Sequence, residues 1–143
     1  MEIKELMTRD PEWIGSDSPI ALAARQMRNR GIGYLPVCDS GRLLGVLTDR
    51  DIVVRVVAEN LDPAKTAVRA VMTADPVWCY DYEKLEEVVQ LMEGWRIRRL
   101  PVLDGEHRLV GVLSVDDIAR PVSRRDLAGE LMEKVAGRRP LPP

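Results

Sequence analysis

The stretch Gly45–Asp51 reads GVLTDRD, and the stretch Gly111–Asp117 reads GVLSVDD. Each opens with an apolar run typical of a β-strand and continues with a hydroxyl residue that is followed three positions later by aspartate. Such a box can cap the first turn of a helix, or its carboxylate can hold the two hydroxyls of a sugar. The doubled stretch therefore predicts two strand-to-helix junctions and leaves two roles open for the aspartates.

The rest of the chain is duplicated in the same order. Shifted by 65 residues, MTRDPEW at 7–13 lies on MTADPVW at 72–78, and LPVCD at 35–39 lies on LPVLD at 100–104. The chain is therefore a tandem repeat. We expect a first repeat over residues 1–60, a second over 67–121, and a C-terminal helix and tail over 122–143.

Hydrophobic periodicity assigns the elements within each repeat. Apolar residues recur at helical spacing in both copies, at Ile20, Ala23, Ala24 and Met27 and at Leu85, Val88, Val89 and Met92. Ser18 and Pro19 predict the N-cap and the first residue of the first helix. Two short apolar runs and a second helix follow each stripe, so each copy reads strand, helix, strand, strand, helix. The fold class is α/β (α+β): two pseudo-symmetric repeats that pack together through their sheets, plus a C-terminal helix over 124–135.

Composition narrows the class of protein. The 143 residues are 45% hydrophobic and carry a formal net charge of −2, which indicates a globular protein without a global field for nucleic acid. No segment approaches the about 20 apolar residues of a membrane span. We therefore expect a cytoplasmic protein that binds neither nucleic acid nor membrane.

The combination of MTxDP, a helix, LPV and GVLTDRD, occurring twice, resembles the cystathionine-beta-synthase (CBS) domain, whose tandem pair is called a Bateman module. The run GIGYLPVCDSGRLLGVLTDRDIV is further similar to the hypoxic response protein subgroup of small bacterial CBS proteins. The resemblance implies a non-catalytic regulatory sensor. It would bind an adenosyl nucleotide such as AMP, ADP or ATP in clefts between the repeats and would signal by a conformational or oligomeric change.

The resemblance also implies site residues. Asp51 and Asp117 would accept hydrogen bonds from the ribose hydroxyls, and Thr48 and Ser114 would contact ribose or phosphate. The remaining ligand-binding candidates lie near the short first strands and the LPV motifs: Ile14 and Cys79, which would flank the base, and Tyr34, Pro36, Pro101, Arg98 and Arg99.

Two arguments favour a ligand over a simple cap. Aspartate is shorter than the glutamate or glutamine that usually reaches back in a capping box. Arg98 and Arg99 precede Leu100 where basic residues of the family often touch phosphate, and arginine suits phosphate well. The matching positions in the first repeat are Gly33 and Tyr34, so we expect two unequal sites.

The alternative function is a ligand-free dimeric interaction scaffold, in which both boxes only cap helices. In either case the helix faces predict a homodimer, with a protein partner as a further possibility. We find no pattern for a nucleophile, a general base or a metal site, so we expect no enzyme and no required cofactor. S-adenosylmethionine and NADH remain alternative adenosyl ligands. Cys38 and Cys79 are predicted to be buried apolar residues.

Overall fold

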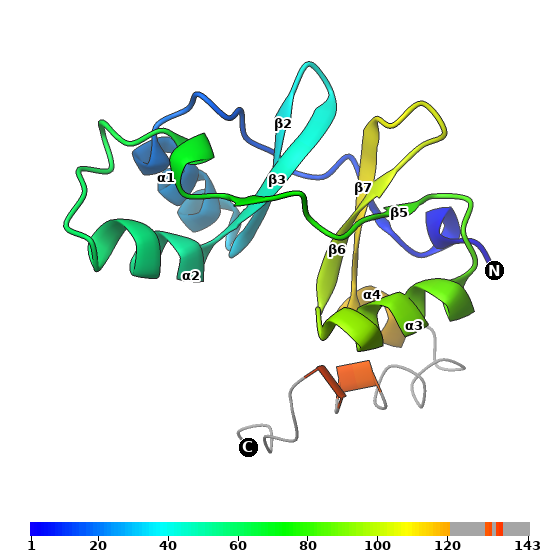
Figure 1. Cartoon of the computed structure of the whole chain (residues 1–143). Helices are drawn as coiled ribbons and strands as arrows, with labels where there is room; N and C mark the ends of the chain where they lie inside the picture. The colour runs from blue at the N-terminus through cyan, green and yellow to red at the C-terminus, as the bar shows by residue number, and fades with distance from the viewer. Residues whose placement is uncertain (121–130, 133, 136–143) are drawn as a thin grey trace. The chain divides into compact units, whose positions relative to one another are not determined.

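The structure is a computed structural model that describes residues 1–120, 131–132 and 134–135 (Figure 1). The chain forms two compact units. Unit 1 comprises Met1–Pro11, Val77–Glu106 and Val110–Pro143, and unit 2 comprises Glu12–Pro76 and His107–Leu109. Each unit has its own sheet and its own helices, which confirms the predicted mixed α/β class.

Unit 2 is built around the hairpin of β2 and β3, which Figure 1 shows as two long antiparallel arrows. Its sheet has the order β2-β3-β4. The core joins side chains of α1, the hairpin and the second helical segment: Ile20, Ala23, Met27, Leu35, Val37, Leu47 and Val56. The elements are α1 (Ile20–Arg30), β2 (Tyr34–Asp39), β3 (Arg42–Thr48), α2 (Asp49–Ile52), the π-helical turn η2 (Val53–Val57), the 3-10 turn η3 (Val68–Ala70) and β4 (Thr73–Ala74).

Unit 1 repeats this plan with a sheet of order β1-β7-β6-β5. Its core joins all four residues of the predicted stripe of α3 to the sheet and to the last helix: Leu85, Val88, Val89, Met92, Leu100, Val102, Leu113 and Ile118. The elements are the 3-10 turn η1 (Ile3–Glu5), β1 (Thr8–Arg9), β5 (Cys79–Tyr80), α3 (Leu85–Trp95), β6 (Arg99–Leu103), β7 (Leu109–Ser114) and α4 (Val115–Ala119).

The MT motifs are exchanged between the repeats. β1, from the start of the first repeat, pairs with β7 of the second repeat, with Thr8 opposite Val112 and Arg9 opposite Gly111. β4, from the start of the second repeat, pairs with β3 of the first repeat. Each compact unit therefore contains the leading strand of the other repeat. The predicted repeat boundaries, 1–60 and 67–121, follow the order of the sequence and differ from the boundaries of the compact units. These repeat boundaries stay a prediction, and so does the packing of the repeats through their sheets.

The N-terminal half of α1 differs from the prediction. Pro19, not Ser18, is the N-cap, and no side chain caps the helix. Pro19 forms an antiparallel bridge with Ala67, which holds it in extended backbone, so the helix begins one residue later. Ala24 is exposed, and α1 therefore buries a narrower stripe than predicted.

The second helix of each repeat is short. In unit 2, four α-helical residues are followed by the π-helical turn η2, of which Val56 is buried whereas Val53 and Val57 are 57% and 68% exposed. In unit 1, α4 ends at Ala119. Most of the predicted final helix over 124–135 lies outside the described residues, although Leu131 is buried in the core of unit 1. Among the described residues, no helix is long and apolar enough for a membrane span.

Candidate functional site

Both doubled boxes form complete helix caps. Thr48 ends β3 with extended backbone, its Oγ1 accepts from the Asp51 amide at 3.1 Å, and its own amide donates to Asp51 Oδ2 at 3.0 Å. Ser114 and Asp117 make the same two bonds at 3.1 and 3.0 Å. Aspartate is therefore not less suited to this role than glutamate or glutamine, contrary to our expectation: a carboxylate at the third helical position accepts from the N-cap amide in both boxes.

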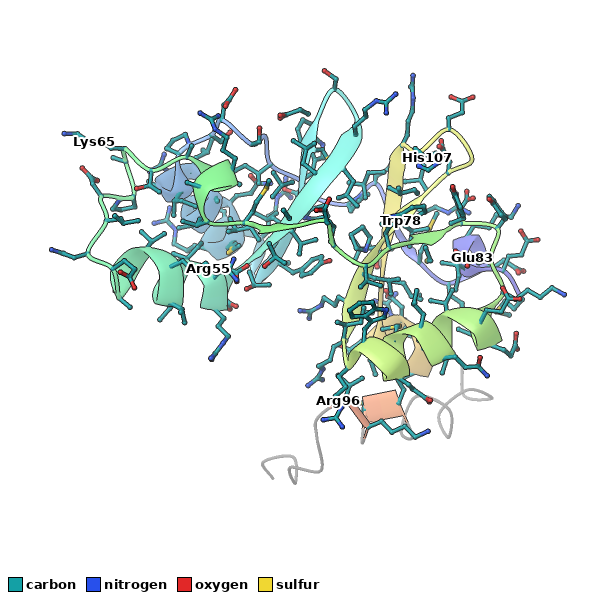
Figure 2. All side chains as sticks on the ribbon, in the orientation of Figure 1. Arg55, Lys65, Trp78, Glu83, Arg96 and His107 are labelled. Atoms are coloured by element: carbon teal, nitrogen blue, oxygen red, sulfur yellow. The ribbon has the colours of Figure 1, made fainter. Side chains whose placement is uncertain are left out.

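The second carboxylate oxygen of Asp51 points to an arginine. Arg55 Nη2 lies 3.6 Å from Asp51 Oδ1. Arg55 extends from η2 (Figure 2), and its Nη1 donates to the carbonyl of Val71 at 2.7 Å and to Thr73 Oγ1 at 3.3 Å. The first box is therefore connected through Arg55 to β4, the exchanged strand.

The second box is connected to its exchanged strand more directly. Thr8 Oγ1 of β1 donates to Asp117 Oδ1 at 3.2 Å, and Arg120 Nη2 lies 3.4 Å from the same oxygen. Asp117 is only 3% exposed. Since a carboxylate offers about four acceptor positions, both aspartates cap a helix with Oδ2 and contact a polar side chain outside the box with Oδ1.

Sequence reasoning missed Thr8, Thr73 and Arg55. The signal for the two threonines was present, since Thr8 and Thr73 occupy matching positions in the doubled MT motif. Nothing along the chain, however, relates Thr8 to a carboxylate 109 positions away. The signal becomes interpretable only once the strands are paired.

The predicted basic residues lie beside the second box. The carbonyl of Arg98 accepts from the Val115 amide at 3.0 Å, so its backbone adjoins the first turn of α4. Arg98 and Arg99 are both exposed. Tyr34 lies directly opposite Thr48 in the β2–β3 register. The structure thus places the backbone of Arg98 beside Val115 and the backbone of Tyr34 beside Thr48, within their respective units.

The other ligand candidates have buried side chains. Ile14 is 3% exposed and packs in the core of unit 2, and Cys79 is fully buried in the core of unit 1. Pro36 and Pro101 are buried as well, and the Pro36 carbonyl accepts from the Ile14 amide at 3.0 Å. The side chains of Ile14 and Cys79 therefore pack in the cores of their units.

The two thiols are shielded from reaction. Burial, together with the Asp39 charge, raises the pKa of Cys38 to about 11. Burial, together with Glu83 and Asp81, raises the pKa of Cys79 to about 12. Because the thiolate is the reactive form, a raised pKa keeps both thiols protonated at neutral pH and slows their reaction. Since the folded pKa is raised, the contribution of each thiol to stability is present below the unfolded pKa and is lost as pH rises toward the folded value.

Cysteine labelling tests this shielding. We expect iodoacetamide to modify the native protein slowly at mildly alkaline pH and to modify both cysteines rapidly in concentrated guanidinium chloride. Intact-protein mass spectrometry follows the two reactions. Rapid uptake of one label by the native protein would show that a thiol is accessible.

Comparison with known proteins agrees with the duplicated architecture. Residues 3–58 and 68–124 match the CBS domain. Hypoxic response protein 1 of Mycobacterium tuberculosis (strain ATCC 25618 / H37Rv) is 40% identical over 119 residues, covering 82% of each chain.

Solved structures share the fold. The crystal structure of Hypoxic Response Protein I with two coordinated zinc ions has a TM-score of 0.78 at 35% identity, covering 85% of this chain and 98% of that one. Among the described residues here, no group of three or more His, Cys, Asp or Glu side chains could hold a metal ion. The CBS domain pair of protein MJ0100, in complex with 5′-methylthioadenosine and S-adenosyl-L-methionine, has a TM-score of 0.74 at 27% identity, covering 87% of this chain and 98% of that one. The chain therefore belongs to the CBS domain family, as a tandem pair.

Proposed function

We propose that this protein is a regulatory sensor that binds an adenosyl ligand through the box aspartates and signals by a change of conformation or assembly. The observation that carries the proposal is that the two oxygens of each carboxylate have different partners: Oδ2 accepts from the N-cap amide, whereas Oδ1 contacts a side chain outside the box. An acceptor of this kind suits a ribose diol. The adenosyl ligands of the MJ0100 pair support the same class.

Signalling would use the exchanged strands. A ribose that hydrogen-bonds to Asp117 Oδ1 competes with Thr8 of β1, and a ribose at Asp51 competes with Arg55, which also contacts β4. Occupancy would then alter the attachment of β1 or β4 to its unit. A ligand shifts an equilibrium only through such differential contacts.

A ligand-free scaffold is the second candidate, because both capping boxes are complete without any ligand. Exposed apolar side chains on the second helical segment of unit 2, Val53, Val54 and Val57, support a homodimer or a protein partner for either candidate. The two candidates differ in whether the carboxylates bind a small molecule.

The test is a binding panel with AMP, ADP, ATP, NADH and S-adenosylmethionine. A ligand at about 100 times its Kd stabilises the protein by about 2.7 kcal/mol, which a thermal-shift measurement detects. Asp117→Asn keeps an oxygen for the Ser114 amide but removes the charge, so it separates ligand binding from capping. We expect it to weaken binding about ten- to a hundredfold, since hydrogen bonds to charged groups contribute about 1.5–3 kcal/mol.

Asp116→Asn is the matched control, because Asp116 is the exposed neighbour in the same first turn. Light scattering on the same samples reports the oligomeric state with and without ligand. If no compound in the panel shifts melting, or if Asp117→Asn and Asp51→Asn bind as tightly as the control, the scaffold is the better assignment.

A further inference from the structure

The two repeats place different charges at one equivalent point of their backbones. In unit 2 the Asp49 amide donates to the Gly33 carbonyl at 3.0 Å. In unit 1 the Val115 amide donates to the Arg98 carbonyl, also at 3.0 Å. Gly33 therefore corresponds to Arg98, and Asp49 corresponds to Val115, by structure as well as by sequence.

In unit 2 a carboxylate occupies the space beside Gly33. A Cβ added to Gly33 would lie 2.6 Å from Asp49 Oδ2 and 2.9 Å from Asp49 Cγ. The carboxylate is held there because its Oδ1 accepts from the Arg50 amide at 2.9 Å. The carboxylate of Asp49 thus lies where the other repeat carries the Cβ of Arg98.

Unit 1 has the opposite arrangement. Val115 is 2% exposed and contributes to the core, so this position carries no charge. Arg98 and Arg99 are exposed next to it. At the first turn of the second helix, unit 2 carries Asp49 and Asp51 together with Arg50 and Arg55, whereas unit 1 carries Asp116 and Asp117 together with Arg98, Arg99 and Arg120.

We infer that the two sites select ligands by charge. This inference rests on the proposed function. Unit 1 takes an adenosyl ligand with a phosphate, and unit 2 takes an adenosyl ligand without a phosphate, either uncharged or cationic. Arg98 and Arg99 are the basic residues that the family resemblance already implies for a phosphate, and Asp49 over Gly33 is the specificity-determining residue that the structure adds. Arginine pairs with phosphate through its planar fork, whereas a carboxylate at the equivalent position repels it.

The experiment exchanges these residues and measures AMP and adenosine binding by isothermal titration calorimetry. The double change Arg98→Gly with Arg99→Tyr gives unit 1 the residues that unit 2 carries at the equivalent positions, Gly33 and Tyr34. We expect AMP binding to weaken at least about tenfold, equivalent to about 1.4 kcal/mol, while adenosine binding stays the same. The AMP affinity of the wild type should fall with added salt more than its adenosine affinity.

The reverse exchange tests unit 2. Gly33→Arg requires Asp49→Val in the same chain, because the new Cβ would collide with the carboxylate. We expect this double variant to bind AMP at an additional site with an affinity within about tenfold of unit 1. Asp49→Ala adds no bulk and should raise AMP binding relative to adenosine severalfold even if the double variant folds poorly.

Arg96→Gly is the control for charge alone. Arg96 is exposed at the end of α3 (Figure 2) with a left-handed φ of 55°, a conformation that glycine adopts readily. It should leave AMP binding within twofold of the wild type, a difference of about 0.4 kcal/mol. If adenosyl ligands bind but the exchanges leave the ratio of AMP to adenosine unchanged, charge selection is wrong and the proposed function stands. If the wild type binds neither AMP nor adenosine, charge selection is overturned together with adenosyl sensing.

Discussion

Gly45→Ala is expected to lower the free energy of unfolding by about 1–3 kcal/mol, the usual cost of overpacking. A Cβ at this position would lie 2.6 Å from the carbonyl oxygen of Thr73 and 2.8 Å from the sulfur of Met72. Since Thr73 belongs to β4, which pairs with β3 at this point, the backbone itself must move. The measurement is equilibrium urea unfolding followed by circular dichroism.

Gly111→Ala is the equivalent change in unit 1. Its Cβ would meet Met7 Sδ at 2.5 Å and the Thr8 carbonyl oxygen at 3.0 Å. The flexible Met7 side chain can move more easily than backbone, so we expect a smaller loss than for Gly45→Ala. Glycine therefore occurs at the start of both GVL motifs because the exchanged strand, β4 beside β3 and β1 beside β7, leaves no room for a Cβ.

Gly94→Ala is the matched control. Gly94 lies within α3, and a Cβ there would have no neighbour within 4 Å. Alanine should stabilise the helix by about 0.5–1 kcal/mol. If Gly45→Ala were as stable as the wild type, β4 could not lie as close to β3 as the structure places it.

Asp117→Ala is expected to destabilise the protein by about 2 kcal/mol or more. The loss combines the cap bond from the Ser114 amide, about 0.5–2 kcal/mol, with a further donor left unpaired in a buried place, about 1–3 kcal/mol. That donor is the Thr8 hydroxyl, and Asp117 is only 3% exposed.

Asp51→Ala provides the comparison within the same chain. Its side chain is 13% exposed, and Arg55 retains the Val71 carbonyl and Thr73 without it. We expect a loss of about 1 kcal/mol, close to that of a cap alone. Equal losses for the two alanine variants in urea unfolding would show that the contact between Thr8 and Asp117 contributes nothing to stability.

Features of the fold that have local causes could be predicted from the sequence. The first helix and the two strands that follow it in each repeat were predicted from hydrophobic periodicity, and all four stripe residues of α3 are buried as predicted. The predicted first strand of the first repeat is only an isolated bridge between Ile14 and Val37. The two boxes followed from a spacing of three residues, and both form. The prediction that Ser18 is the N-cap of α1 was wrong, because Pro19 is held in extended backbone by its bridge with Ala67 and the helix begins one residue later.

Which strand lies beside each box could not be predicted from the sequence, because it depends on pairing between segments far apart in the chain. β1 and β4 are short segments without a periodicity of their own, and each pairs with the other repeat. The contact between Thr8 and Asp117 joins residues 109 positions apart, and the carboxylate of Asp49 over Gly33 depends on how the first turn of α2 meets the start of β2. Local patterns fix local backbone, whereas the partners of a carboxylate depend on chain segments that come together only when the sheets form.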